Sequence, residues 1–199
     1  DKPLVRCQFF IDEGTAKSRE EKDKVPYGEW IRNGWVLATK GDEINFEEIQ
    51  DFIETACADF DVLQVNYDPA FAQQMFADMK NKGINTAEFR QNSRTYTDVI
   101  NAFEIAVESG AVDIARNDCL LWCLANTQII TFTSGYLFPS KSGTETKRID
   151  GAVASLMAFD GMIKRAAENS GVSASQIAYL RAKGYEVSDD GKILKVPQK

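Results

Sequence analysis

Histidine is absent from the 199 residues of this chain. Catalytic arrangements that depend on a histidine base, such as Ser-His-Asp and Cys-His, are therefore excluded within it. Acid, base or metal chemistry must use aspartate, glutamate, lysine, tyrosine or cysteine side chains.

Long apolar runs are also absent. No stretch reaches the roughly 18 consecutive apolar residues that suggest a membrane-spanning helix, and the first residues do not resemble a secretion signal. We therefore expect a soluble, non-secreted protein without a membrane partner. Apolar residues make up 44% of the chain, which is enough for one sizeable core.

Cysteine is scarce, and each cysteine lies within an apolar segment: Cys7, Cys57, Cys119 and Cys123. This pattern predicts reduced thiols in the core. Cys119 and Cys123 have helical i,i+4 spacing, but a zinc site would need two further soft ligands, so the core role is favoured. The net charge of −7 argues against a surface that holds nucleic acid mainly by counterion release. A nuclease whose carboxylates are offset by metal ions remains compatible with it.

Strand and helix patterns alternate along the middle of the chain, which predicts an α/β fold with parallel βαβ units. The apolar strand at 62–66 is followed by a helix that Pro69 opens and Gly83 ends, and another strand follows near 87–90. The other expected elements are strands at 4–11, 35–39, 127–133 and 136–138, helices starting near 26, 45, 97, 117 and 148, a charged loop at 12–24 and a polar loop at 140–146.

Two helix starts carry capping signals. Asn45 can cap one helix with Glu48 completing a capping box, and the apolar face of that helix is expected to lie on a sheet. Thr97 can cap the next amphipathic helix. Residues 1–169 are expected to form one domain. Residues 170–199, with a short helix and an Asp190-Gly191 hairpin, are expected to form a small carboxy-terminal appendage.

Two aspartates stand at positions suited to metal chemistry. Asp68 follows the strand at 62–66, and Asp150 begins a helix rich in small residues. If the fold brings them together, their hard oxygens suit divalent cations such as Mg²⁺ or Mn²⁺. The plainer interpretation is that each caps a helix, and both roles are compatible because a capping carboxylate keeps free lone pairs.

An ordered set of short motifs resembles the carboxy-terminal nuclease domain of large terminase subunits from tailed bacteriophages, which has a ribonuclease H-like fold. The resemblance covers roughly residues 4–163, and its specificity lies in the order and spacing of the whole set. The motifs are PYGEW at 26–30 with Gly34, TKG at 39–41, YDP at 67–69, RQ at 90–91, LW at 121–122 with Asn126, PSK at 139–141 and IDG at 149–151.

This resemblance implies a ribonuclease H-like mixed β-sheet flanked by helices, with Asp68 and Asp150 as catalytic, metal-binding carboxylates and Mg²⁺ or Mn²⁺ in a two-metal site. The implied activity is endonucleolytic cutting of concatemeric double-stranded DNA during genome packaging in the cytoplasm of a bacterial host cell. The implied partners are a terminase ATPase domain, the small terminase subunit and the portal. Lys141, Lys147 and Arg148 are candidate DNA contacts, whereas Trp122 is expected in the core and Arg90 and Gln91 in structural roles.

The sequence departs from the family pattern at two points. The family's first metal-binding aspartate lies on a strand before the one that 4–11 resembles, so we expect the domain to be trimmed at its amino end; Asp12 is a poor substitute. No G-x-x-x-x-G-K-[ST] loop is present, so the packaging ATPase is expected in a preceding domain. Two other interpretations stay open: a non-catalytic docking module of the packaging motor, and a ribonuclease H-like resolvase or transposase.

Overall fold

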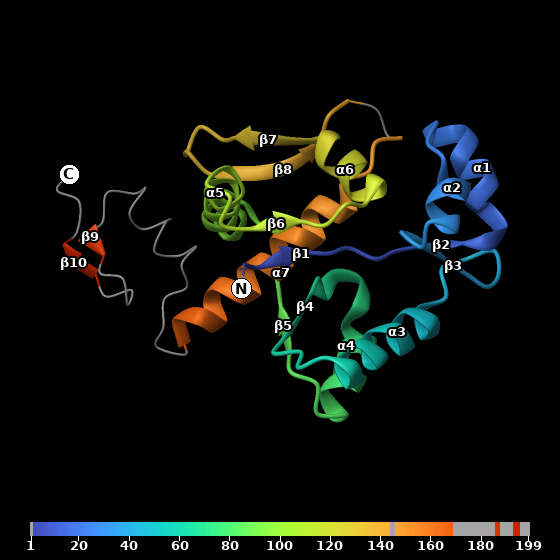
Figure 1. Cartoon of the computed structure of the whole chain (residues 1–199), viewed down its shortest axis with the longest axis horizontal. Helices are drawn as coiled ribbons and strands as arrows, with labels where there is room; N and C mark the ends of the chain where they lie inside the picture. Colours follow the sequence, from blue (N-terminus) through green and yellow to red (C-terminus); the bar gives the residue numbers. More distant parts are fainter. Residues whose placement is uncertain (1, 144–145, 169–185, 188–192, 196–199) are drawn as a thin grey trace.

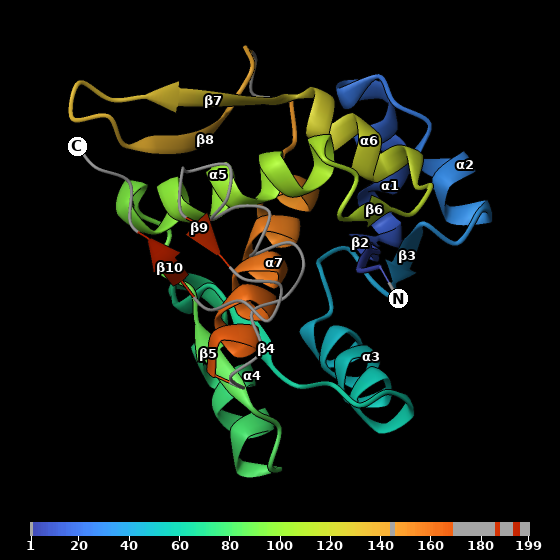
Figure 2. The same ribbon diagram turned by 60° about the vertical axis from the view of Figure 1, so that its left-hand side comes forward.

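The computed structural model describes residues 2–143, 146–168, 186–187 and 193–195 (Figure 1). Helix α7 (Asp150–Glu168) runs through the middle of the molecule. The β7–β8 hairpin and α5 lie on one side of it, and β4, β5 and α4 lie on the other (Figures 1 and 2). This is the α/β, ribonuclease H-like arrangement that the sequence predicts, although the described strands associate in separate pairs.

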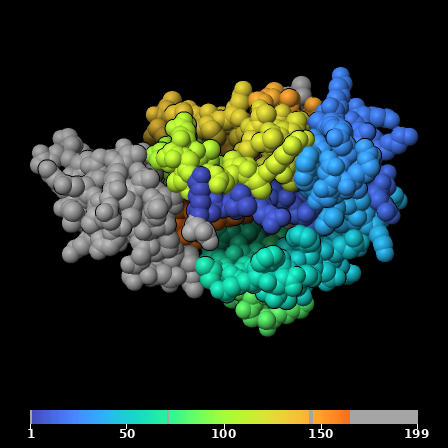
Figure 3. All heavy atoms as spheres, viewed as in Figure 1, coloured from blue at the N-terminus to red at the C-terminus, as the bar shows by residue number. Residues whose placement is uncertain are grey.

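The amino-terminal segment forms two short strands where the sequence predicts one. Strand β1 (Leu4–Val5) pairs in parallel with β6 (Asp113–Ile114), and β2 (Phe9–Asp12) pairs in parallel with β3 (Val36–Thr39). In the space-filling view this segment, in dark blue, crosses the face between the α5–α6 region and α3 (Figure 3). It therefore contributes a strand both to the pair with β6 and to the pair with β3.

The predicted loop at 12–24 is wrong, because these residues form helix α1 (Glu13–Asp23). Asp12 caps the helix by accepting a 2.8 Å hydrogen bond from the Thr15 backbone N–H. Charged side chains such as Lys and Glu have good helix propensity, so a helix can form without an apolar stripe. Only Asp23 of α1 is buried. The next helix, α2 (Tyr27–Arg32), begins after Pro26 as expected.

Helix α3 (Phe46–Asp59) starts at the predicted cap. Asn45 Oδ1 accepts hydrogen bonds from the N–H groups of Glu47 and Glu48. The sequence predicts that its apolar face lies on a sheet, but no residue of α3 is buried. Its ring contact with β2, between Phe52 and Phe10, has centroids 5.4 Å apart.

The predicted parallel βαβ unit is confirmed. Strand β4 (Val65–Tyr67) leads into α4 (Pro69–Asn81), and β5 (Thr86–Glu88) pairs in parallel with β4. The ring of Tyr67 stacks on Phe76 of α4 at 4.2 Å between centroids. This packing fixes the chain on both sides of Asp68.

Helix α5 (Ser93–Glu108) begins one turn earlier than predicted, with Asn92 and not Thr97 as its cap. Thr97 lies inside the helix and donates to the carbonyl of Ser93. The main apolar core lies between α5 and α7. Its buried members are Phe89, Tyr96, Val99, Ile100, Ala102, Ala106, Val112, Leu156, Met157 and Phe159.

The predicted hairpin is confirmed. Helix α6 (Asp118–Ala125) precedes β7 (Thr127–Thr131), which pairs antiparallel with β8 (Leu137–Lys141). Ser140 and Lys141 therefore belong to a strand and not to the predicted loop at 140–146, because Thr127 and Gln128 pair with them.

The carboxy-terminal strands β9 (Glu186–Val187) and β10 (Ile193–Lys195) pair antiparallel, as the hairpin prediction requires. The short helix predicted after Ser173 lies outside the described residues. Within the described part of the chain, no helix combines the length and the apolar character needed to cross a membrane.

Candidate functional site

Asp68 links β4 to α4 and caps the helix. Its Oδ1 accepts a 2.9 Å hydrogen bond from the Ala70 N–H, and Pro69 occupies the first helical turn. Its Oδ2 accepts a 2.6 Å hydrogen bond from Gln91 Nε2. The side chain is half-buried. Each carboxylate oxygen has thus one described hydrogen bond and retains lone-pair capacity for another ligand.

Gln91 is itself held by Tyr96, whose hydroxyl donates a 2.9 Å hydrogen bond to Gln91 Oε1. Tyr96 is fully buried. Burial, and secondarily the negative charge of Asp68, raise the pKa of Tyr96 to about 12. The chain Tyr96–Gln91–Asp68 therefore fixes the orientation of one carboxylate. Sequence reasoning assigned Gln91 a structural role but did not identify Asp68 as its partner, since the two residues are 23 positions apart.

Asp150 is the first residue of α7, and its side chain is exposed. The head of this helix packs tightly: a Cβ added at Gly151 would lie 2.6 Å from the Phe9 ring. Two buried thiols of α6 also lie nearby. A hydrogen bond from Cys119 lowers the pKa of Cys123 against the opposing effect of burial, while the negative charge of Asp150 disfavours ionisation of both thiols. All four cysteines are free; Cys119 and Cys123 lie in the core as predicted, whereas Cys7 and Cys57 are only half-buried.

The elements that carry Asp68 and Asp150 are in direct contact. Asn66 Nδ2 of β4 donates a 2.6 Å hydrogen bond to the Met157 carbonyl of α7. A Cβ added at Gly161 would meet both Asn66 and Gln64. Gln64 lies beside Gly161, and Asn66, two residues later, also contacts Met157, which is nearer the start of α7. The chain therefore runs from Gln64 toward Asp68 in the direction of the amino-terminal end of α7, where Asp150 lies.

Among the residues that the structure describes, no group of three or more Cys, Asp and Glu side chains is arranged to hold a metal ion. A site built on Asp68 and Asp150 would therefore combine two protein carboxylates with water, substrate oxygens or further ligands. Carboxylate oxygens are suitable donors for Mg²⁺ and Mn²⁺. Their joint role as metal ligands stays a prediction.

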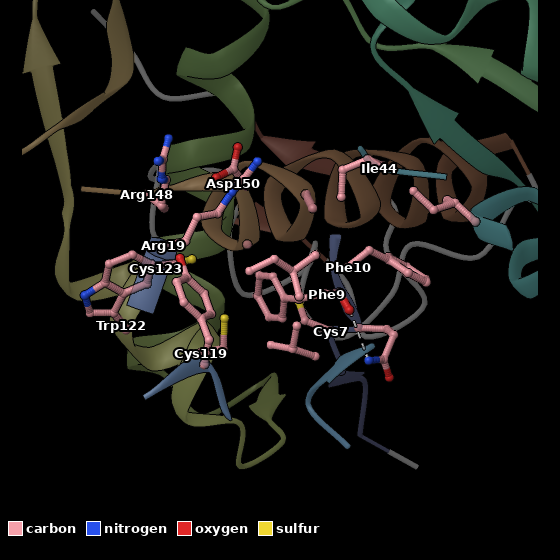
Figure 4. Close-up of a pocket in the computed structure, with 17 residues that line it drawn as sticks. Cys7, Phe9, Phe10, Arg19, Ile44, Cys119, Trp122, Cys123, Arg148 and Asp150 are labelled. Atoms are coloured by element: carbon pink, nitrogen blue, oxygen red, sulfur yellow. Dashed lines mark hydrogen bonds between the residues drawn. The ribbon is translucent and has the colours of Figure 1, made fainter. Parts of the chain in front are cut away.

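An open cavity of about 470 Å³ lies beside Asp150, between β2 and the starts of α6 and α7. In Figure 4 the side chains of Arg19, Arg148 and Asp150 gather at one end of it. Trp122 is half-buried: it lines the cavity and packs against Trp30 and Tyr27 at the edge of the core, so the expected core role is met only in part.

Asp12 is buried and committed to the amino-terminal part of the fold. Burial disfavours its charged form, but hydrogen bonds from Thr15 and the positive charge of Arg19 outweigh this and lower its pKa. Its Oδ2 lies 3.3 Å from Arg19 Nη2. Asp12 therefore caps α1 and pairs with Arg19.

The three candidate DNA contacts occupy different settings. Lys141 is exposed at the end of β8, and Lys147 is half-buried before α7. Arg148 Nε lies 3.4 Å from Asp23 Oδ2, and its carbonyl accepts a hydrogen bond from the buried Asn126. The sequence alone does not indicate that Asp23 and Arg19 lie near these residues, because it predicts a loop where the structure has α1.

The α/β fold, with β4 in contact with α7, places the chain in the ribonuclease H-like class. A family model described as "Terminase large subunit, endonuclease domain" matches residues 5–167, so the chain belongs to this family.

Individual relatives agree with this assignment. The chain is 27% identical to Protein YmfN of Escherichia coli K12 over 160 residues, covering 77% of this chain and 35% of that protein. It is 25% identical to the terminase large subunit of Enterobacteria phage HK97 over 165 residues, covering 82% and 32% of the two chains. The crystal structure of the HK97 large terminase superimposes with a TM-score of 0.72 at 25% identity, covering 79% of this chain and 33% of that one. The chain thus spans about a third of the length of these relatives.

Proposed function

We propose that this domain is a metal-dependent endonuclease that cuts concatemeric double-stranded viral DNA during genome packaging. The observation that carries the proposal is the contact between β4 and α7, which connects the strand before Asp68 to the helix that begins at Asp150. In a member of the terminase endonuclease family, this contact supports a shared site for both carboxylates.

In the proposed mechanism, Asp68 and Asp150 hold Mg²⁺ or Mn²⁺. Two such ions would activate a water molecule and stabilise charge on the attacking and leaving oxygens of the phosphodiester. Gln91 orients Asp68 through its 2.6 Å hydrogen bond. Lys141, Lys147 and Arg148 would hold the DNA backbone, since cationic side chains are the usual contacts to phosphate oxygens.

The wider setting follows from the family and is part of the proposal. Residues 1–169 would form the nuclease domain and residues 170–199 a separate appendage. The domain would act in the bacterial cytoplasm with a terminase ATPase domain, a small terminase subunit and the portal. A docking module of the same fold would bind such partners without cutting DNA. A resolvase or transposase would prefer branched DNA.

Plasmid nicking in Mn²⁺ tests the proposal, with wild type compared with Asp150→Ala. The control is Asp98→Ala, which removes an exposed aspartate of α5. We expect nicking by wild type and the control and a loss of at least about a hundredfold in Asp150→Ala, because metal stabilisation of the transition state contributes several kcal/mol. Equal nicking by all three proteins contradicts the assignment of Asp150. Absence of metal-dependent nicking in wild type favours the docking module, and a strong preference for branched substrates favours a resolvase.

A further inference from the structure

Two arginines from distant parts of the sequence lie at the end of the cavity where Asp150 is found. Arg19 comes from the middle of α1, and Arg148 immediately precedes α7 (Figure 4). Their side chains are 43% and 33% exposed, and both line the cavity. The cavity itself is otherwise lined largely by apolar and thiol side chains.

Each arginine is anchored by a buried carboxylate. Arg19 Nη2 lies 3.3 Å from Asp12 Oδ2, and its Nε donates a 2.9 Å hydrogen bond to Thr15 Oγ1. Arg148 Nε lies 3.4 Å from Asp23 Oδ2. The Asp12 and Asp23 side chains are 1% and 0% exposed.

These anchors leave part of each donor fork available. A guanidinium carries five N–H donors, and the described contacts use Nε of Arg148 and Nε with one Nη of Arg19. Anchoring also restricts the side-chain rotamers before a ligand binds, so binding costs less conformational entropy. Two fixed guanidinium groups are therefore available at the end of the cavity beside Asp150.

We propose that Arg19 and Arg148 form a phosphate subsite beside Asp150, which binds a DNA backbone phosphate next to the one that is cut. This inference rests on the proposed function and deepens it. Guanidinium groups bind phosphate oxygens through paired, charge-assisted hydrogen bonds. Asp150 alone would repel such a phosphate, but a divalent cation bound there would reverse the local field. The subsite would thus set where the DNA strand lies relative to the carboxylate that holds the metal.

The test measures binding of a short DNA duplex by fluorescence anisotropy over a range of salt concentrations. All proteins carry Asp150→Asn, which removes the repelling charge, and the buffer contains EDTA, so that no metal-dependent cleavage occurs during the binding measurement. The test variants are Arg19→Gln and Arg148→Gln. The control is Lys17→Gln, which removes the same charge from an exposed residue of α1 two positions from Arg19. We expect a loss of affinity of about fivefold or more at low salt for each test variant, and a decrease of about 1 in the slope of log affinity against log salt.

Removing Arg19 leaves Asp12 buried without its ion-pair partner, and removing Arg148 does the same to Asp23, so both glutamine variants are checked for folding by thermal unfolding. Arg19→Lys provides the second variant, because lysine keeps the charge beside Asp12 but lacks the planar fork. We expect it to unfold like the parent and to bind DNA more weakly. If Arg19→Lys and a folded Arg148→Gln bind with the affinity and salt slope of the Lys17→Gln control, the subsite does not exist.

The readout is binding and not cleavage, so the two proposals can fail separately. If wild type and Asp150→Ala nick DNA equally, the proposed role of Asp150 in cleavage is wrong, but the DNA-binding result for the arginine variants still stands. Unchanged binding by the arginine variants overturns the subsite while metal-dependent nicking still stands.

Discussion

Gln91 donates a 2.6 Å hydrogen bond to Asp68, and the buried Tyr96 hydroxyl holds Gln91 in place. The orientation of Asp68, one proposed metal ligand, is thus fixed by Gln91, which precedes α5, and through it by Tyr96 of α5. Partners of this kind commonly change metal affinity by about 10- to 100-fold when they are removed.

We expect Gln91→Ala to weaken Mn²⁺ binding by about tenfold, because Asp68 would lose its fixed orientation. Mn²⁺ titration followed by electron paramagnetic resonance measures the affinity. Gln74→Ala is the matched control, since Gln74 is an exposed glutamine that contacts Asp78 on α4. Identical Mn²⁺ affinities for the two variants would show that Gln91 does not position a metal ligand.

The two roles of Asp68 can be separated by substitution. Asp68→Ala removes the helix cap and should lower the free energy of unfolding by about 1 kcal/mol. Asp68→Asn keeps an oxygen for the Ala70 N–H but loses the acceptor that faces Gln91, so it should be less destabilised than Asp68→Ala, as asparagine caps about as well as aspartate. Both variants should lose Mn²⁺ binding. Urea unfolding combined with Mn²⁺ titration measures the difference. Strong Mn²⁺ binding by Asp68→Asn would limit Asp68 to capping.

Tyr96 predicts a dependence of stability on alkaline pH. Its folded-state pKa is raised to about 12 by burial and by Asp68. The unfolded chain, whose tyrosines titrate near ~10, therefore releases this proton first as the pH rises. The stabilisation is complete below pH ~10 and is lost between ~10 and ~12, at no more than ~1.4 kcal/mol per pH unit. Urea unfolding over this range, compared with Tyr96→Phe, measures it. An equal slope in the variant would mean that Tyr96 does not contribute.

Gly151 predicts a packing limit at the head of α7. A Cβ at this position would lie 2.6 Å from the Phe9 ring and 3.2 Å from Leu120. Gly151→Ala should therefore lower the free energy of unfolding by about 1–3 kcal/mol through overpacking. The higher helix propensity of alanine would instead raise the free energy of unfolding by about 1 kcal/mol. Urea unfolding decides between the two effects, and a stabilised variant would show that β2 and α7 can separate at this point.

Much of the fold could be predicted from local sequence signals. The βαβ unit around Asp68 follows from an apolar strand, Pro69 and Gly83, and the structure has that unit. Helix α1 could not be predicted from apolar periodicity, because it buries only Asp23 and depends on the Asp12 cap. The polar sequence around Lys141 predicts a loop, but Lys141 belongs to β8 because it pairs with Thr127 of β7, a partner that the local sequence does not reveal.

The candidate site was only partly accessible to sequence reasoning. The family motifs point to Asp68 and Asp150 one by one as candidate metal ligands. The residues that flank each aspartate predict that it lies at the start of a helix. The partners of the site depend on tertiary contacts. Gln91 reaches Asp68 across 23 positions, and Arg148 reaches Asp23 across 125. No local pattern encodes such pairs.

A crystal structure of the protein with bound Mn²⁺, with the ions located by anomalous scattering, tests the central claim most directly. The account predicts manganese between the Asp68 and Asp150 carboxylates, with Mn–O distances near ~2.1–2.2 Å, which is slightly longer than for Mg²⁺. Manganese bound to only one of these carboxylates, or at neither, would contradict a shared metal site.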